Sequence, residues 1–293
     1  MTFRRRILRF LHDRPQWQAW SLLAPGALWL MFFFLLPVMI LFTYSFMPKG
    51  LYGGVEWGFT TEHYVRFFEP LYLTILARSV VEALVTTVLC LLLGYPVAYV
   101  ITRAGEWKSL ALFGVILPFW TSFLVRTFAM IFLLRDTGLI NTLLLWSGLV
   151  SEPLPLLDTP FAVLVGLVYG FLPFMVLPIY SSLEKLDLTL LEAAEVLGAR
   201  PSSRFFRVTL PLSMPGVVAG CLLVFIPSLG TFLTSDLLGG AKTILIGNFI
   251  QNQFTGARNW PFGSAASFVL MAMVLVAVLI YLRIRDADEE INS

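Results

Sequence analysis

Two carboxylates stand within strongly apolar stretches of this 293-residue chain, and each is a candidate for binding a cation. Asp236 ends an apolar segment and follows a polar series at roughly helical spacing: Ser228, Thr231, Thr234 and Ser235. Such a stripe on one helix face suits the wall of a polar cavity. The alternative is a helix end whose carboxylate simply faces water.

Glu82 is the second of these acids. It is a candidate for lining a cavity, and it also lies four residues after Arg78, a spacing that allows an ion pair along one helix. Arg126 is a fixed cation in another apolar stretch, so it would repel a cationic ligand. We therefore expect Arg126 to have a structural role, neutralised by an acid across the bundle.

Aromatic rings attract cations with about 0.5–2 kcal/mol per contact. Trp120 and Tyr169 are candidates for this role, beside Phe174, Phe225 and Phe232. Helix packing or lipid contact is the competing explanation for each, since aromatic residues make up 15% of the chain.

The residue types needed for enzymatic catalysis do not cluster in this sequence. His12 and His63 lie far apart without ligand-spaced partners, so no metal site is predicted. Cys90 and Cys221 lie in apolar runs, as small packed residues do. The chain has no G-x-x-x-x-G-K-[ST] loop, which cradles nucleotide phosphates. We expect neither an enzyme nor a bound cofactor.

A polar loop, residues 183–213, lies between two apolar segments of the sequence. Residues 186–199 are predicted to form a helix capped by Asp187 and ended by Gly198, which reaches positive φ without a Cβ penalty. Ala193 and Ala194 are small enough for another protein to approach closely. A second helix is predicted over 201–209, after which Leu210-Pro211 should redirect the chain into the next apolar segment.

The elements that carry these residues are membrane spans. The chain is 58% hydrophobic and 13% charged, against about 25% charged in soluble domains. Six windows satisfy the length of about 20 apolar residues that a spanning helix needs. They are roughly 21–46, 75–102, 110–134, 160–182, 214–236 and 263–284. The fold class is all-α and polytopic, with a transmembrane domain at 21–284 between terminal segments 1–20 and 285–293.

Basic residues predict the orientation, since they are enriched on the cytoplasmic side. With the N-terminus inside, thirteen fall on the cytoplasmic side and five outside, the outer ones being Lys49, Arg66, Arg135, Lys242 and Arg258. Both termini and the polar loop are thus expected in the cytoplasm. Outside, Ile246, Phe249, Ile250 and Phe254 predict a short amphipathic helix, either resting at the lipid headgroups or docking a partner.

Proline and glycine predict irregular helices within the spans. Pro227 and Gly230 lie beside the polar stripe of the fifth window, where we expect a broken or kinked helix. Breaks of this kind expose backbone groups to cargo in transporters. A kink made only for packing is the alternative.

The polar loop resembles the EAA loop of permease subunits of ABC importers. The resemblance is carried by Glu192-Ala193-Ala194, Gly198-Ala199 and Leu210-Pro211 at their spacings. Longer runs, among them 89–100, 117–128, 166–194, 214–225, 235–250 and 260–265, resemble PotB-type permeases of spermidine/putrescine importers. The resemblance implies a type I ABC importer permease fold in a bacterial inner membrane.

What the resemblance further implies is a machine of several subunits. The loop residues Glu192, Ala193, Ala194, Gly198, Leu210 and Pro211 would couple this chain to an ATPase dimer that holds ATP and Mg²⁺. A second homologous permease and a periplasmic solute-binding protein would complete it, with no nucleic acid involved. Polyamines are the expected cargo, another small organic cation or solute being the alternative. A secondary transporter would need internal repeats or a chain of buried acids, and neither is found.

Overall fold

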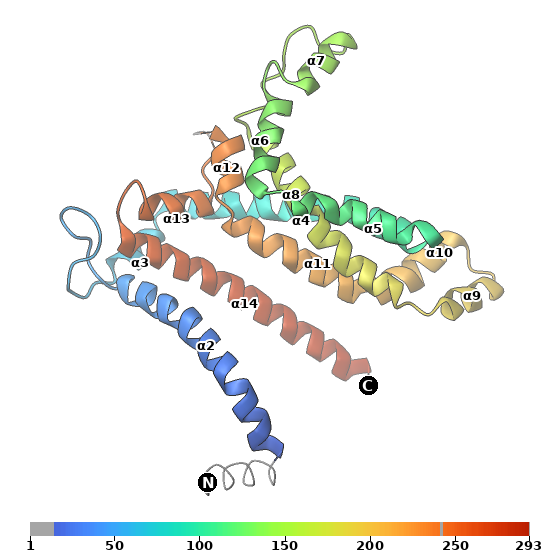
Figure 1. Cartoon of the computed structure of the whole chain (residues 1–293), viewed down its shortest axis with the longest axis horizontal. Helices are drawn as coiled ribbons and strands as arrows, with labels where there is room; N and C mark the ends of the chain where they lie inside the picture. The colour runs from blue at the N-terminus through green and yellow to red at the C-terminus, as the bar shows by residue number, and fades with distance from the viewer. Residues whose placement is uncertain (1–14, 241–242, 293) are drawn as a thin grey trace, which may run out of the picture. The chain divides into compact units, whose positions relative to one another are not determined.

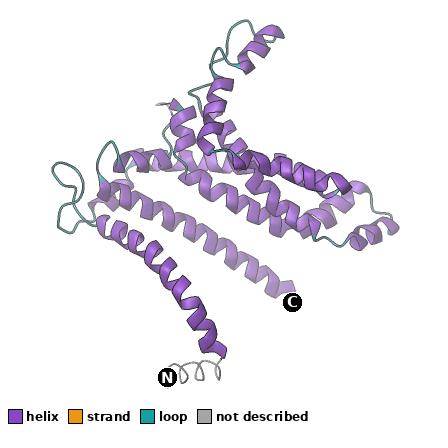
Figure 2. Cartoon of the chain, in the orientation of Figure 1, coloured by secondary structure: helices purple, strands orange, loops and turns teal. Residues whose placement is uncertain are grey.

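A computed structural model describes residues 15–240 and 243–292. Over these residues the chain is helical and contains no strand beyond an isolated bridge between Lys49 and Val55 (Figure 2). This confirms the predicted all-α class. The chain divides into two compact units, residues 1–68 with 253–293 and residues 69–252. The expected outer Lys242 and the basic residues Arg4, Arg5, Arg6, Arg9 and Arg14 lie outside the described residues.

The first unit contains α2 (Pro15–Tyr44), the short α3 (Glu62–Phe67) and the long α14 (Trp260–Asn292). Phe42 of α2 makes an edge-to-face contact with Phe268 of α14 at 5.3 Å between ring centroids. The hydroxyl of Ser45 lies 2.8 Å from the hydroxyl of Tyr64. The apolar window of α2 has no buried residue, as expected for a helix surrounded by lipid or by another subunit.

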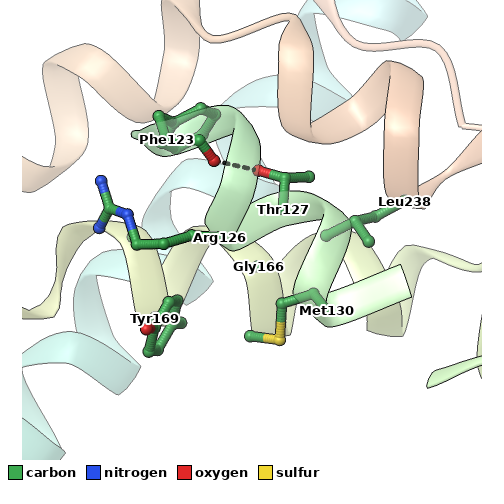
Figure 3. A pocket seen from close by; sticks show the side chains of 8 residues that line it. Phe123, Arg126, Thr127, Met130, Gly166, Tyr169 and Leu238 are labelled. Atoms are coloured by element: carbon green, nitrogen blue, oxygen red, sulfur yellow. Dashed lines mark hydrogen bonds between the residues drawn. The ribbon is translucent and has the colours of Figure 1, made fainter. Parts of the chain in front are cut away.

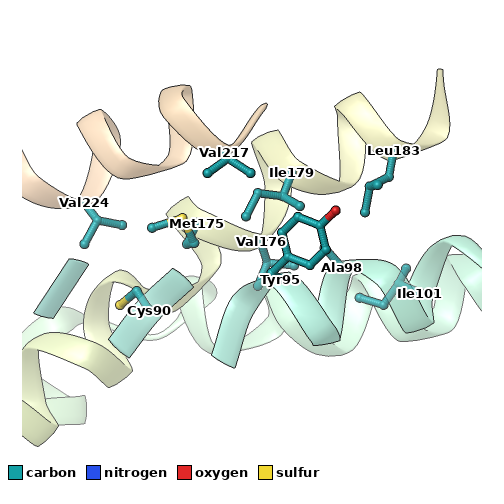
Figure 4. Close-up of a cluster of buried hydrophobic side chains, with 10 residues drawn as sticks. All are labelled: Cys90, Tyr95, Ala98, Ile101, Met175, Val176, Ile179, Leu183, Val217 and Val224. Carbon is teal, nitrogen blue, oxygen red and sulfur yellow. The ribbon is translucent and has the colours of Figure 1, made fainter. Parts of the chain in front are cut away.

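Three long helices form the centre of the second unit: α4 (Pro70–Thr102), α8 (Pro160–Glu184) and α11 (Leu210–Gly230) (Figure 1). Their shared core holds Met175, Val176 and Ile179 of α8 between Cys90 of α4 and Val224 of α11 (Figure 4). Apolar side chains gain little from burial when the alternative is lipid, so close van der Waals packing must hold this core together.

Glycine allows α11 to approach α8 closely. A Cβ at Gly216 would stand 2.5 Å from the carbonyl oxygen of Pro178, and one at Gly220 would stand 2.7 Å from the sulfur of Met175. Small residues at helix contacts are the usual means of close packing in membranes. Gly216 and Gly220 therefore fix the distance between the two helices.

The third apolar window, predicted as a single span over 110–134, is broken in the structure. It comprises α5 (Lys108–Ile116), the 3-10 turn η2 (Leu117–Trp120) and α6 (Phe123–Leu134). Pro118 tightens the turn and Thr121 is extended, with ψ of 146°. A further helix, α7 (Leu139–Trp146), follows, and by length and composition the third candidate span is Phe123–Trp146. Hydropathy alone did not locate the break.

The fifth window differs at both ends. The short α10 (Pro201–Arg204), the π-helical turn η3 (Phe205–Thr209) and α11 run on without interruption, so the prediction that Leu210-Pro211 redirects the chain was wrong. Proline is tolerated in the first turn of a helix, because the N–H it lacks is not needed there. At the other end α11 stops at Gly230, and α12 (Leu233–Leu238) begins after the extended Thr231. The predicted break is confirmed.

Candidate functional site

The polar loop contains a capped helix, α9 (Leu188–Val196), as predicted. The carboxylate of Asp187 accepts a hydrogen bond of 2.9 Å from the backbone N–H of Thr189. This bond lowers the pKa of Asp187 below its ordinary value, because it stabilises the charged form. Gly198 follows the helix with φ of +79°, the left-handed conformation expected for a glycine that ends a helix.

The outer surface of α9 is uncovered. Glu192 and Ala193 are exposed, and the apolar side chains of Val196 and Leu197 are 88% and 87% exposed. An ion pair between Glu195 and Arg204 ties α9 to α10. Exposed apolar residues rimmed by charges are typical of a protein-docking surface. Leu210 and Pro211 instead belong to the first turn of α11, away from α9 in the chain.

Leu191 of α9 contributes to the lining of a cavity of about 200 Å³, whose other lining residues are Tyr99, Thr102, Arg103, Lys108, Leu183, Glu184, Leu186 and Thr209. Lys108, at the start of α5, forms an ion pair with Glu184, at the end of α8. The hydrogen bond to Glu184 is the main cause that raises the pKa of Lys108. This pair links the loop before α5 to the base of the polar loop, a contact that the sequence did not reveal because the two residues lie 76 positions apart.

The break after α11 is held by a compact set of polar contacts. Ser235 donates its hydroxyl proton to the carbonyl oxygen of Thr243 at 2.9 Å, and Asn248 donates to the Ser235 hydroxyl at 3.3 Å. Ser235 is completely buried, whereas Asp236 is exposed. In this conformation Ser235 helps to hold the break through these hydrogen bonds, and Asp236 lies on α12 beyond the break rather than at the end of the span.

Glu82 lies on α4 near a residue that contacts this break, and its Oε1 has no hydrogen-bond partner among the described residues. One turn earlier on α4, the hydroxyl of Ser79 accepts a 2.7 Å hydrogen bond from the backbone N–H of Ile246. At Gly247 a Cβ would be 2.6 Å from the carbonyl oxygen of Thr231, so this part of α4, the start of α13 (Ile246–Phe254) and the break come together.

Oε1 of Glu82 and the hydroxyl of Thr86, one turn apart on α4, are both buried and accept or donate no hydrogen bond. The described residues contain no ion pair between Glu82 and Arg78, the alternative that the spacing allowed. Two unsatisfied oxygen atoms on neighbouring turns are costly inside a membrane protein. They are suited to accept hydrogen bonds from an ammonium group. Thr86 was missed at the sequence level, although its spacing of four from Glu82 was a usable signal.

Two of the aromatic candidates, Tyr169 and Trp120, lie elsewhere. Tyr169 of α8 lines a small cavity of about 10 Å³ together with Arg126, Thr127 and Met130 of α6 (Figure 3). Trp120 is 75% exposed and packs edge-to-face on Phe113 at 5.4 Å. The candidate residues thus fall into separate places on the second unit. Thr231 shares the region of the break with Ser235, Asp236 and the Ser79 turn, while Tyr169 adjoins Arg126.

Comparison with known proteins gives close relatives over most of the chain. The spermidine/putrescine transport system permease protein PotB of Haemophilus influenzae is 45% identical over 256 residues, covering 87% of this chain and 90% of that protein. PotB of Escherichia coli K12 is also 45% identical, with coverage of 87% and 93%.

A solved structure shares the fold. The bacterial ABC transporter involved in the import of the acidic polysaccharide alginate contains a chain that superposes with a TM-score of 0.69 at 20% identity, covering 95% of this chain and 99% of that one. At this identity the likeness concerns the fold alone. It confirms the predicted ABC importer permease fold.

The family that matches this chain is described as "Binding-protein-dependent transport system inner membrane component", and the match covers residues 91–287. Among the described residues, six helices are long and apolar enough to cross a membrane, in accord with a multi-pass inner-membrane protein. Members of this family are transport components and not enzymes. The chain belongs to the family of inner-membrane permease components of binding-protein-dependent transport systems.

Proposed function

We propose that this chain is one of two permease subunits of an ATP-driven importer of polyamines such as spermidine and putrescine. The observation that carries the proposal is the 45% identity, over 87% of the chain, to two permeases that are named for these substrates. The match extends over 256 residues, so it cannot be confined to the polar loop and includes most of the spans.

The proposed assembly has four kinds of subunit. This chain and a second, homologous permease form the path, and two ATPase subunits below them bind ATP and Mg²⁺. A periplasmic binding protein delivers the cargo from above. Both termini and the polar loop face the cytoplasm, which the excess of basic residues on that side supports.

In this assembly α9 is the coupling helix. Glu192, Ala193 and Ala194 contact the ATPase, and Gly198 frees the chain to turn back toward α10. Leu210 and Pro211 transmit the movement, since α10, η3 and α11 form one continuous rod into the membrane. The support is the exposed surface of α9 together with its ion pair to α10.

Glu82 is the strongest candidate for contact with the cargo. A protonated amine would satisfy Oε1 of Glu82 and could share the hydroxyl of Thr86, both of which lack partners. Thr231, Ser235, Asp236, Trp120 and Tyr169 remain proposed pathway residues, and the exposed carboxylate of Asp236 is suited to an entry point. The charge of the cargo and that of the acids are complementary.

Uptake of labelled spermidine and putrescine tests the cargo. Cells lacking their own polyamine importers would express this chain with its partner subunits. We expect ATP-dependent accumulation of at least one polyamine. If neither enters while the complex is assembled, another organic cation is the cargo, and competition by unlabelled cations would identify its class.

The coupling role has its own test. Glu192→Lys should abolish uptake and cargo-stimulated ATP hydrolysis while the subunit still inserts, because the reversed charge opposes docking of the ATPase. Glu106→Lys, in the exposed 3-10 turn η1 (Gly105–Trp107), is the matched control and should transport normally. Normal uptake by the Glu192 variant would refute the coupling role.

A further inference from the structure

Arg126 lies in an apolar part of the chain, and two of its nitrogen atoms have no acceptor among the described residues. It is the one charged residue between positions 110 and 134. Its Nε and one Nη are buried and donate no hydrogen bond. No carboxylate in the part of the chain that the structure describes forms an ion pair with it, so the expected neutralising acid across the bundle is not found there.

The guanidinium is nonetheless held in position. It lies over the ring of Phe119 at 5.1 Å and over that of Phe123 at 5.6 Å from the centroids. In Figure 3 it extends from α6 on the side away from Thr127 and Leu238. Cation–π contacts orient a guanidinium but leave its N–H donors unsatisfied, which is unfavourable inside a membrane.

The surface of α6 around Arg126 suits a neighbouring helix. Four residues before and three residues after it are Ser122 and Ala129, which are small and exposed. Val125 beside it is 61% exposed. Small residues let another helix approach closely in a membrane, and the apolar rim would pack against it.

We infer that Arg126 receives a carboxylate from a membrane helix of the second permease subunit. The inference rests on the proposed function, which supplies that subunit. A polyamine cannot be the partner, because it carries the same sign of charge. A carboxylate on an apolar helix satisfies the buried donors and fits the small, apolar surface, and a bidentate pair would fix the register of the two subunits.

The test is recovery of the second permease with this chain. All subunits are co-expressed, this chain carries an affinity tag, and the second permease is measured after solubilisation in mild detergent. Arg126→Glu should lower its recovery by about tenfold or more, because two like charges would meet in a low-dielectric contact. Arg135→Glu is the matched control: Arg135 ends the same helix and stacks on Phe132 at 5.0 Å, but it is exposed. Its recovery should be unchanged.

One further measurement keeps the inference testable should Arg126→Glu fail to insert. A photo-reactive amino acid in place of Val125, with Arg126 intact, should cross-link to the second permease. Where Arg126→Glu does insert, a lysine placed at the partner's matching intramembrane acid should restore recovery.

The outcomes separate the two proposals. If the unaltered chain recovers no second permease, the proposed assembly is wrong. If it does, and Arg126→Glu recovers as much, only the inference about Arg126 fails. Cross-linking at position 125 to lipid alone also overturns it, in favour of an anionic headgroup as the acceptor.

Discussion

At the scale of single residues, burial separates three charges that the sequence presents alike. Glu82 and Arg126 each keep buried polar atoms without partners, whereas Asp236 is exposed. A buried unpaired charge is tolerated where a partner arrives from outside the chain. Because Glu82 and Arg126 carry opposite charges, they need different partners: an amine for Glu82 and a carboxylate for Arg126.

Glu82→Gln should weaken cargo binding without preventing assembly. An ionised acceptor contributes more than a neutral amide, so we expect KM for spermidine uptake to rise about tenfold. Initial rates over a range of spermidine concentrations measure it. Glu69→Gln, which replaces an acid at the exposed start of the same helix, is the control. Equal KM values for both variants and the unaltered complex would remove Glu82 from the path.

At the scale of elements, α9 depends on a single side-chain cap. Leu191 and Ala194 are half-buried, and the other described side chains from Thr189 to Val196 are exposed, so packing contributes little to keeping α9 helical. Helices this short are marginal in water without such support. The cap and the ion pair to α10 therefore decide how well the docking surface is formed.

Asp187→Ala should loosen α9, while Asp187→Asn, which can still cap, should not. Amide hydrogen exchange of residues 189–196 should quicken about fivefold in the alanine variant. Because the native pKa of Asp187 is lowered, the carboxylate stabilises α9 fully above the ordinary pKa of aspartate and loses this effect as pH falls through the lowered value. Protection that is unchanged by alanine would show that the cap is dispensable.

The close contact between α8 and α11 leads to a second prediction at this scale, which concerns the stability of the chain. Gly216→Val should destabilise the chain by about 1–3 kcal/mol, since a Cβ there meets the backbone of Pro178, which cannot move aside. Thermal unfolding in detergent measures the loss. Gly114→Val is the control, because a Cβ at Gly114 in α5 meets nothing within 4 Å. Comparable melting of the two variants would contradict close α8–α11 packing.

At the scale of the whole molecule, the family match identifies a transport component. The sequence contains no phosphate-binding loop, and the described residues hold no cluster of His, Cys, Asp and Glu that could bind a metal ion. In the proposed complex ATP hydrolysis by the partner subunits supplies the work.

Polyamine uptake should therefore depend on ATP hydrolysis and not on an ion gradient. In proteoliposomes holding the whole complex and the binding protein, vanadate should abolish polyamine uptake, because it traps the ATPase subunits. A protonophore should leave uptake unchanged. Transport that persists in vanadate and stops with the protonophore would point to a secondary transporter instead.

The sequence by itself determined that the chain is embedded in a lipid bilayer. It also determined the number of candidate spans, the capped helix of the polar loop and the family. These follow from local features: apolar run length, a capping residue followed by Gly198, and extended similarity. The break at Gly230 was also predictable, because proline and glycine act locally on the backbone.

Only the tertiary structure decided which polar groups have partners. Lys108 meets Glu184 and Ser79 meets Ile246 across long stretches of sequence, and no local pattern encodes such pairs. The interruption at Thr121 and the unbroken passage through Leu210-Pro211 depend likewise on the turns around them. The unpartnered Glu82 and Arg126 could be recognised only once every neighbour was in place, since an unmet hydrogen bond is a property of the packed molecule.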